Sequence, residues 1–239
     1  MSTNKIRSII NFYLSPHNLL YGVRNPQTLI FQHLIFLVKH PALFYKTRIV
    51  KGYLKPEVGV ALYEAVLRTR HESINIVEVG IYKGLSTIYL AEAARKVNRR
   101  VKSFDWFNGL TGVDPVLDSN FKDGDCISDV NDWEFNVRKN TSREIVDLTI
   151  GDALKTMLPV IKDSGFAIAF LDVDLYDVTR DLLLQLGEVA RGGEVIFIHD
   201  ADSPGIEMAI NEFLTLRRFP VKKEYLDNKS TAKLTILPF

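Results

Sequence analysis

Two successive apolar runs of the sequence end in side chains that could do chemistry. Asp172 and Asp174 close one run, and His199 and Asp200 close the next, 25 residues beyond Asp174. If both runs are neighbouring strands of a parallel sheet, their ends lie about 5 Å apart and the four side chains converge. Clustered carboxylates repel each other unless a cation or a shared proton relieves them. The spacing therefore favours a functional site, with a cation or a shared proton, at the ends of these two runs.

The residue types at these ends suggest a metal ion. A hard divalent cation such as Mg²⁺ prefers oxygen ligands, which the clustered carboxylates of Asp172, Asp174 and Asp200 would offer. The imidazole of His199 is a softer ligand that also suits Mn²⁺, Fe²⁺ or Zn²⁺. The alternative is structural, because Asp is favoured at helix N-caps and in solvated loops.

A glycine turn after an earlier apolar run is the second candidate. Glu78 is followed by Gly80 and Gly84, and an expected helix begins directly after them. Glycines let a ligand approach the backbone, and the helix start offers N–H groups to an anion. The dinucleotide fingerprint Gly-x-Gly-x-x-Gly fails because position 82 is Tyr, which argues against a nicotinamide oxidoreductase. A purely structural turn remains the alternative.

The next expected strand ends in Asp105. An acid at this place can accept hydrogen bonds from ribose hydroxyls, whereas its plainer role would be that of a cap or loop carboxylate. The residues that follow, 106–127, form the longest stretch without periodicity. Loops of this length in compact domains are usually functional or mobile.

Alternating strands and helices must position these side chains. Expected helices are 56–68, 85–97, 128–140 (with Ser128 as N-cap), 153–162, 175–189 and 205–216; expected strands are 75–80, 101–105, 146–150, 166–171, 194–198, 222–226 and 233–237. Strand–helix alternation predicts a parallel sheet, and the closing strand pair predicts an antiparallel edge. We therefore expect an α/β fold: a Rossmann-like, doubly wound, seven-stranded sheet, mostly parallel with an antiparallel C-terminal strand.

Charge divides the chain into two parts. Residues 1–56 hold eight bases and no acid, whereas the other 183 residues hold 22 bases and 29 acids. We therefore expect a basic, acid-free helical extension over 1–56 and one domain over 57–239. The extension could be a lid, a homodimer contact, or an amphipathic anchor for peripheral contact with an anionic membrane.

Composition excludes several classes. The single cysteine, Cys126, rules out a disulfide framework and a multi-cysteine zinc site. The most apolar stretch, 29–45, is interrupted by polar residues and is too short to span a bilayer, and a secretory signal is not evident. We expect a cytoplasmic protein. A net charge of +1 and the lack of a basic aromatic groove argue against nucleic acid as a partner.

From about residue 75 to its end, the chain resembles class I S-adenosylmethionine-dependent methyltransferases. More narrowly, it is similar to the macrocin O-methyltransferase family, which methylates sugar hydroxyls on natural products with Mg²⁺. The matching pieces are VEVGIYKGLST (77–87), SFDWFNGL (103–110), GDALKTMLP (151–159), LDVDLYDVT (171–179) and GGEVIFIHD (192–200).

The resemblance implies a place for the methionine part of S-adenosylmethionine. Glu78, Gly80 and Gly84 would shape its pocket, and Ser86 could contact its carboxylate.

The nucleoside part would lie farther along the same edge. By the same resemblance, Asp105 would hold the ribose, Trp106 would flank the adenine, and Asp152 corresponds to the adenine-contact position.

The resemblance also implies a catalytic centre. Asp172, His199 and Asp200 would bind the metal, and Asp174 would be the general base for a hydroxyl of a small-molecule acceptor, such as a sugar. The family has Asp-Asp where this chain has His199 and Asp200, so one negative charge is missing. Either the metal differs, the site is weaker, or methylation is metal-independent. A non-catalytic module that binds a membrane surface or a partner is the remaining alternative.

Overall fold

The computed structural model describes residues 37–71, 73, 75–226 and 229–239. Residues 42–239 form one compact unit. Most of the expected helical extension over 1–56 lies outside the described residues. Its described part contains helix α4 (Pro41–Thr47), after which an irregular segment leads to helix α5.

A seven-stranded sheet forms the centre of this unit, in the order β3-β2-β1-β4-β5-β7-β6. Neighbouring strands from β3 to β5 pair in parallel, and β7 runs antiparallel to both of its neighbours. The predicted fold class is therefore confirmed. The strands are β1 Asn75–Val79, β2 Arg100–Asp105, β3 Val146–Ile150, β4 Ile168–Leu171, β5 Val195–His199, β6 Val221–Leu226 and β7 Thr231–Ile236.

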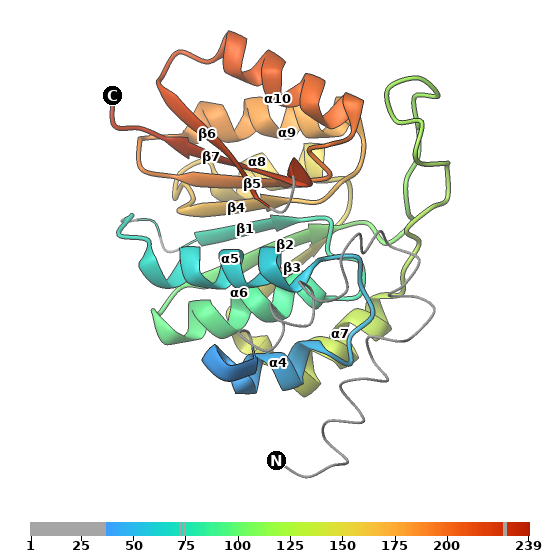
Figure 1. Ribbon diagram of the computed structural model, residues 1–239, viewed down its shortest axis with the longest axis vertical. Coiled ribbons are helices and arrows are strands. Elements are labelled where there is room, and N and C mark those ends of the chain that lie inside the picture. Colours follow the sequence, from blue (N-terminus) through green and yellow to red (C-terminus); the bar gives the residue numbers. More distant parts are fainter. Residues whose placement is uncertain (1–36, 72, 74, 227–228) are drawn as a thin grey trace. The chain divides into compact units, whose positions relative to one another are not determined.

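Helices cover both faces of the sheet, as the prediction of a doubly wound fold requires. Figure 1 shows α8, α9 and α10 on one face and α5 and α6 on the other. The helices are α5 Pro56–Arg68, α6 Leu85–Lys96, α7 Val130–Asn140, α8 Ala153–Ile161, α9 Tyr176–Val189 and α10 Pro204–Leu216. Every residue of β1 and β4 is buried, because these central strands have helices on both sides.

The start of α7 corrects one expectation. Ser128 was the expected N-cap, but the helix begins at Val130, and the side chain of Asp129 accepts a hydrogen bond from the backbone N–H of Asn131. Both residue types cap helices well, so local sequence does not distinguish them. The charge of Asp129 also suits the positive end of the helix dipole.

The loop 106–127 contains neither helix nor strand, as expected. It leaves the carboxyl end of β2 and returns to α7, and Figure 1 shows it as the long green excursion beside the sheet. We call residues 106–127 the edge loop.

Candidate functional site

The predicted site residues all lie at the carboxyl edge of the parallel strands. Those expected to bind the cofactor lie in the last residues of β1 and β2 or shortly after β1, β2 and β3, and those expected to bind metal or act as a base lie at the end of β5 or just after β4 and β5. The two groups meet where β1 lies beside β4, which is where the order of the strands reverses. Open α/β sheets bind their ligands at such a switch point.

The turn after β1 requires glycine for two physical reasons. Gly80 has a φ of +80°, and a Cβ on it would lie 1.9 Å from the carbonyl oxygen of Asp172. No side chain fits there, so the first turn and the end of β4 are in direct backbone contact. Gly84 also has a positive φ, +88°, and packs against the indole of Trp133.

The start of α6 is suited to an anion. Among the residues that the structure describes, none caps this helix with a side chain, and its first turn contains no acid. The free N–H groups and the positive end of the helix dipole favour a carboxylate or phosphate. Ser86 lies in this first turn, as predicted, although its side chain is buried.

Glu78 supports the glycine turn from beneath. Its side chain is fully buried, and its carboxylate accepts hydrogen bonds from the hydroxyls of Thr87 (2.9 Å) and Ser103 (2.7 Å). Burial raises the pKa of Glu78 to about 7, against the lowering effect of hydrogen bonds from Ser103, Ser86 and Thr87. This placement agrees with a residue that shapes a pocket without facing its ligand.

Asp105 organises the same turn from the next strand. One carboxylate oxygen accepts hydrogen bonds from the backbone N–H groups of Ile81 (2.8 Å) and Tyr82 (3.2 Å), and the other accepts one from Phe107 (2.7 Å). Oδ1, which accepts only the N–H of Phe107, retains acceptor capacity that a ribose hydroxyl could use, whereas Oδ2 already accepts two N–H groups. The carboxylate also fixes the backbone that a cofactor would approach.

Two further predicted residues complete this half of the edge. Trp106 follows Asp105, is 37% exposed, and donates its indole N–H to the carbonyl of Gly109 at 2.7 Å. Asp152 is the N-cap of α8 and accepts a hydrogen bond from the N–H of Leu154 at 3.0 Å. Both therefore have structural partners while lying at the predicted adenine end.

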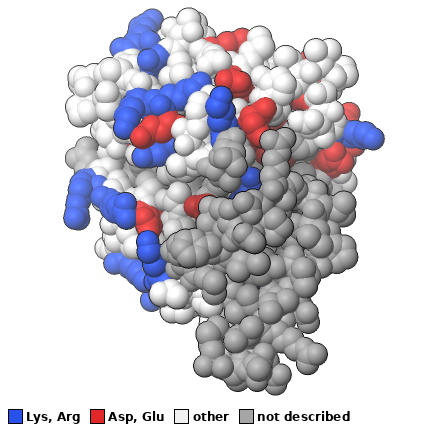
Figure 2. All heavy atoms as spheres, in the orientation of Figure 1, with Lys and Arg blue, Asp and Glu red and all other residues white. Residues whose placement is uncertain are grey.

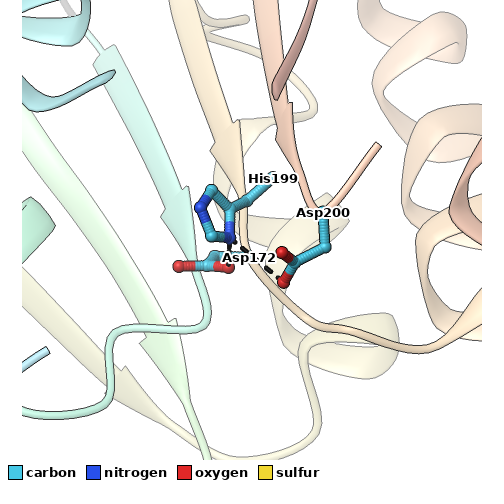
Figure 3. Close-up of side chains that lie close together, drawn as sticks. All are labelled: Asp172, His199 and Asp200. Carbon is cyan, nitrogen blue, oxygen red and sulfur yellow. Dashed lines mark ion pairs between the residues drawn. The ribbon is translucent and has the colours of Figure 1, made fainter. Parts of the chain in front are cut away.

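The other half of the edge brings three predicted metal ligands together. Figure 3 shows the carboxylates of Asp172 and Asp200 both at the Nδ1 edge of the His199 imidazole. Nδ1 of His199 lies 2.9 Å from Asp172 Oδ1 and 3.1 Å from Asp200 Oδ2. One ligand atom from each residue lies within 4.8 Å of the others. Two carboxylates and one imidazole are a donor set that fits a divalent cation such as Mn²⁺, Fe²⁺ or Zn²⁺, and less readily Mg²⁺.

Electrostatics at the cluster depend on the histidine. Burial alone would lower the pKa of His199, but the charges of Asp172 and Asp200 raise it well above its usual range. In turn, His199 lowers the pKa of Asp200 in spite of burial. The two carboxylates thus favour the protonated, imidazolium form of His199, and a metal that bound through Nδ1 would compete with that proton.

Asp174 lies beside this cluster. Burial, together with the negative charge of Asp172 and a hydrogen bond with Asp200, raises the pKa of Asp174 well above its usual range. Its φ of 64° and the φ of 50° at Asp200 are both in the left-handed region, which Asp tolerates better than most residues. Both site acids are therefore held in strained backbone, as is common at functional sites.

Two residues of the edge loop join the site without having been predicted as site residues. Cys126 has its Sγ 3.7 Å from Asp174 Oδ2, and burial and Asp174 raise the pKa of its thiol to about 12. Asp118 is buried and accepts the N–H of Tyr176, the first residue of α9. The sequence signal for both is weak, since neither lies near a strand end or in a motif.

Comparison with solved structures gives several methyltransferases of the same fold. The calicheamicin methyltransferase CalS11 matches with a TM-score of 0.60 and 20% identity, covering 98% of this chain and 93% of that one. The O-methyltransferase NovP matches with a TM-score of 0.59 and 18% identity, covering 76% of this chain and 80% of that one. The O-methyltransferase TomG from Streptomyces achromogenes, solved with S-adenosylmethionine, matches with a TM-score of 0.56 and 15% identity, covering 100% of both chains.

Comparison of sequences adds the family. No curated protein sequence matches this chain. The family model described as "Methyltransferase domain" matches residues 77–201, which is more than half of the chain and includes the carboxyl ends of β1 to β5. The resemblance to methyltransferases inferred from the motifs is thereby confirmed, and the chain belongs to the methyltransferase-domain family with the fold of S-adenosylmethionine-dependent methyltransferases.

Proposed function

We propose that this chain is an O-methyltransferase that uses S-adenosylmethionine to methylate a hydroxyl group of a small molecule, in particular a sugar moiety of a natural product or glycan. One observation carries the proposal. A half-buried carboxylate, Asp174, lies beside a cluster of three potential metal ligands at the switch point of a methyltransferase fold. Such a carboxylate can take the proton of an alcohol whose oxygen then receives the methyl group.

The solved relatives support the acceptor class. One structure of CalS11 is described as a TDP-rhamnose 3'-O-methyltransferase, and NovP and TomG are described as O-methyltransferases. These are properties of those proteins. For this chain, a vicinal diol on a sugar, or a catechol, is the acceptor that a divalent cation at the cluster could chelate.

The cofactor would lie along the first three strands. S-adenosylmethionine, when bound, supplies an activated methyl group on a sulfonium. We propose that the start of α6, at Gly84 and Ser86, holds its carboxylate, because the N–H groups there have no cap. Asp105 and Trp106 would hold the ribose and flank the adenine, and Asp152 would contact the adenine from the start of α8.

The metal would be held by Asp172, His199 and Asp200. A divalent cation there would lower the pKa of an acceptor hydroxyl and fix its orientation. A metal-independent reaction is the second candidate, and the close approach of His199 Nδ1 to both carboxylates favours it. In that case the imidazolium would itself provide the positive charge near the acceptor.

Asp174 would act as the proton acceptor in either case. Burial and the negative neighbours make its carboxylate a stronger base once it is deprotonated. Its strained turn follows β4, which pairs with β1, so the carboxylate would face the proposed methyl donor. The contribution of the protein is then mainly orientation of the hydroxyl and removal of its proton.

Substitution of the base tests this proposal. Asp174→Asn should lower methyl transfer by about 10²–10⁴-fold and leave the affinity for S-adenosylhomocysteine nearly unchanged. Asp177→Asn is a matched control, because Asp177 lies three residues away with its side chain 71% exposed. The assay would follow transfer of labelled methyl groups to a panel of nucleotide sugars, glycosides and catechols. Wild-type turnover in Asp174→Asn would refute its assignment as the base.

A further inference from the structure

Asp118 is a buried acid in the middle of the edge loop. It is 2% exposed, and its Oδ1 accepts the backbone N–H of Tyr176 at 2.9 Å. Its Oδ2 accepts the N–H of Asp114 at 3.2 Å. Tyr176 is the first residue of α9, and the N-cap residue, Leu175, has no polar side chain. Asp118 therefore caps α9 from a position 58 residues earlier in the chain.

A second contact joins the edge loop to α10. The carbonyl of Leu117 accepts the N–H of Gly205, the second residue of α10, at 3.2 Å. A Cβ at Gly205 would lie 2.8 Å from both Asp118 Oδ1 and the Leu117 carbonyl oxygen. Glycine at this position is thus what allows the loop to approach the helix start so closely.

These two helix starts directly follow the two turns of the proposed catalytic centre. Asp174 lies two residues before Tyr176, and Asp200 lies four residues before Pro204, where α10 begins. The end of the edge loop returns to the same place, where Cys126 Sγ lies 3.7 Å from Asp174 Oδ2. The middle of the loop is therefore attached to the two helix starts that follow these turns, and its end contacts the proposed base.

We propose that Asp118 is a positioning residue that docks the edge loop onto the starts of α9 and α10 and so fixes Asp174 on the acceptor side of the site. This inference rests on the proposed function for the role of Asp174, but the docking itself does not. A buried carboxylate that accepts two backbone N–H groups stabilises the docked loop, and its removal leaves the N–H of Tyr176 without its acceptor.

The lone cysteine makes the docking measurable. Cys126 is the only cysteine of the chain and is half-buried against Asp174. Reaction with a maleimide therefore reports on one site. In the full-length protein, Asp118→Ala should increase the labelling rate of Cys126 by about tenfold or more, under conditions in which circular dichroism shows the protein fully folded.

Two further variants separate docking from general damage. Asp118→Asn keeps the oxygen that accepts the N–H of Tyr176, so its labelling rate should return most of the way to the wild-type value. Gly205→Ala should raise the rate like Asp118→Ala, although alanine is the better helix former. Asp123→Ala is the matched control, since Asp123 is an exposed acid of the same loop whose Oδ1 accepts the N–H of Val113 within the loop.

Ligand binding and turnover complete the test. Asp118→Ala should keep its affinity for S-adenosylhomocysteine. If turnover is measured, kcat should fall while KM for S-adenosylmethionine changes less. Labelling of Asp118→Ala at the wild-type rate would overturn the docking role. An equal increase in Asp123→Ala would overturn it as well, because the effect would then not be specific to Asp118. A wild-type protein that fails to bind S-adenosylhomocysteine would refute the proposed function and leave the labelling result to decide on docking alone.

Discussion

The acids of the carboxyl edge differ in what neutralises them, and this difference separates their roles. Glu78 is surrounded by hydroxyls, and Asp105 accepts three backbone N–H groups. Asp172 and Asp200 share the imidazole of His199. For Asp174, burial and the acidic neighbours Asp172 and Asp200 raise the pKa, and its contact with the Cys126 thiol adds no positive charge. That is the expected condition of a proton acceptor, whereas Glu78 and Asp105 accept hydrogen bonds from neighbouring groups, and Asp172 and Asp200 lie beside the imidazole of His199.

Glu78 predicts a pH dependence of stability. Its pKa is about 7 in the folded protein and has the usual value of 4.5 in the unfolded chain. Between these two pH values, the folded protein therefore holds a proton that the unfolded chain has lost. The free energy of unfolding therefore falls as pH rises through this window, by up to about 3 kcal/mol. Glu78→Gln should remove this part of the decline.

Urea unfolding at pH 5 and pH 7.5 would measure the effect of Glu78→Gln. The variant Glu188→Gln, at an exposed position of α9, is the control and should keep the wild-type pH dependence. An equally steep decline in Glu78→Gln would mean that another group carries the titration.

At the scale of elements, the order of strands and helices could be predicted from the sequence because apolar periodicity is a property of short segments. The expected bounds of α5 and β3 agree with the structure, and the long loop after β2 is present. Helix ends were harder, since several residues in a row can cap a helix, as at Ser128 and Asp129. Such ends depend on the competition between neighbouring caps.

The candidate site could be predicted for similar reasons, but only in part. Side chains at the ends of adjacent parallel strands must converge, and Asp172, His199 and Asp200 do. Asp118 could not be found this way, because the N–H that it caps is 58 residues distant and no local pattern marks such a pair. The contacts of Asp105 with the glycine turn likewise depend on the folded backbone.

The contact between the β1 turn and the end of β4 predicts a large effect of one methyl group. Gly80→Ala would place a Cβ 1.9 Å from the Asp172 carbonyl oxygen, in a backbone with a φ of +80°. Gly112→Ala has a similar φ, +75°, but nothing within 4 Å, so it isolates the cost of the backbone conformation. Chemical denaturation should show a loss of about 1 kcal/mol for Gly112→Ala and more than about 3 kcal/mol for Gly80→Ala. Equal losses would show that the turn can move away from β4.

At the scale of the whole molecule, charge is distributed unevenly along the chain. Residues 1–56 hold eight bases and no acid. Figure 2 shows Lys and Arg side chains over β6 and β7 with acidic side chains among them, and Glu224 pairs there with Lys222 and Lys233. None of the helices in the described part of the chain is both long and apolar enough to cross a lipid bilayer.

The basic extension therefore leads to a prediction about surfaces. If residues 1–56 make peripheral contact with membranes, the full-length protein should co-sediment with vesicles that contain anionic lipid and not with neutral ones. The binding should weaken as salt is raised from about 0.05 to 0.5 M, because salt screens exposed charges. Light scattering of the protein without vesicles would measure its molar mass and so show whether it is a homodimer. No sedimentation at low salt would contradict the membrane contact.

Calorimetry with S-adenosylhomocysteine, with and without Mn²⁺ or Mg²⁺, tests whether this edge binds the cofactor beside a cluster of metal-ligating side chains. We expect a dissociation constant on the order of micromolar for S-adenosylhomocysteine. We also expect a separate Mn²⁺ site that disappears in Asp172→Ala while S-adenosylhomocysteine binding persists. A wild-type protein that binds S-adenosylhomocysteine but no metal would favour the metal-independent reaction. A folded protein that binds no S-adenosylhomocysteine would contradict the account.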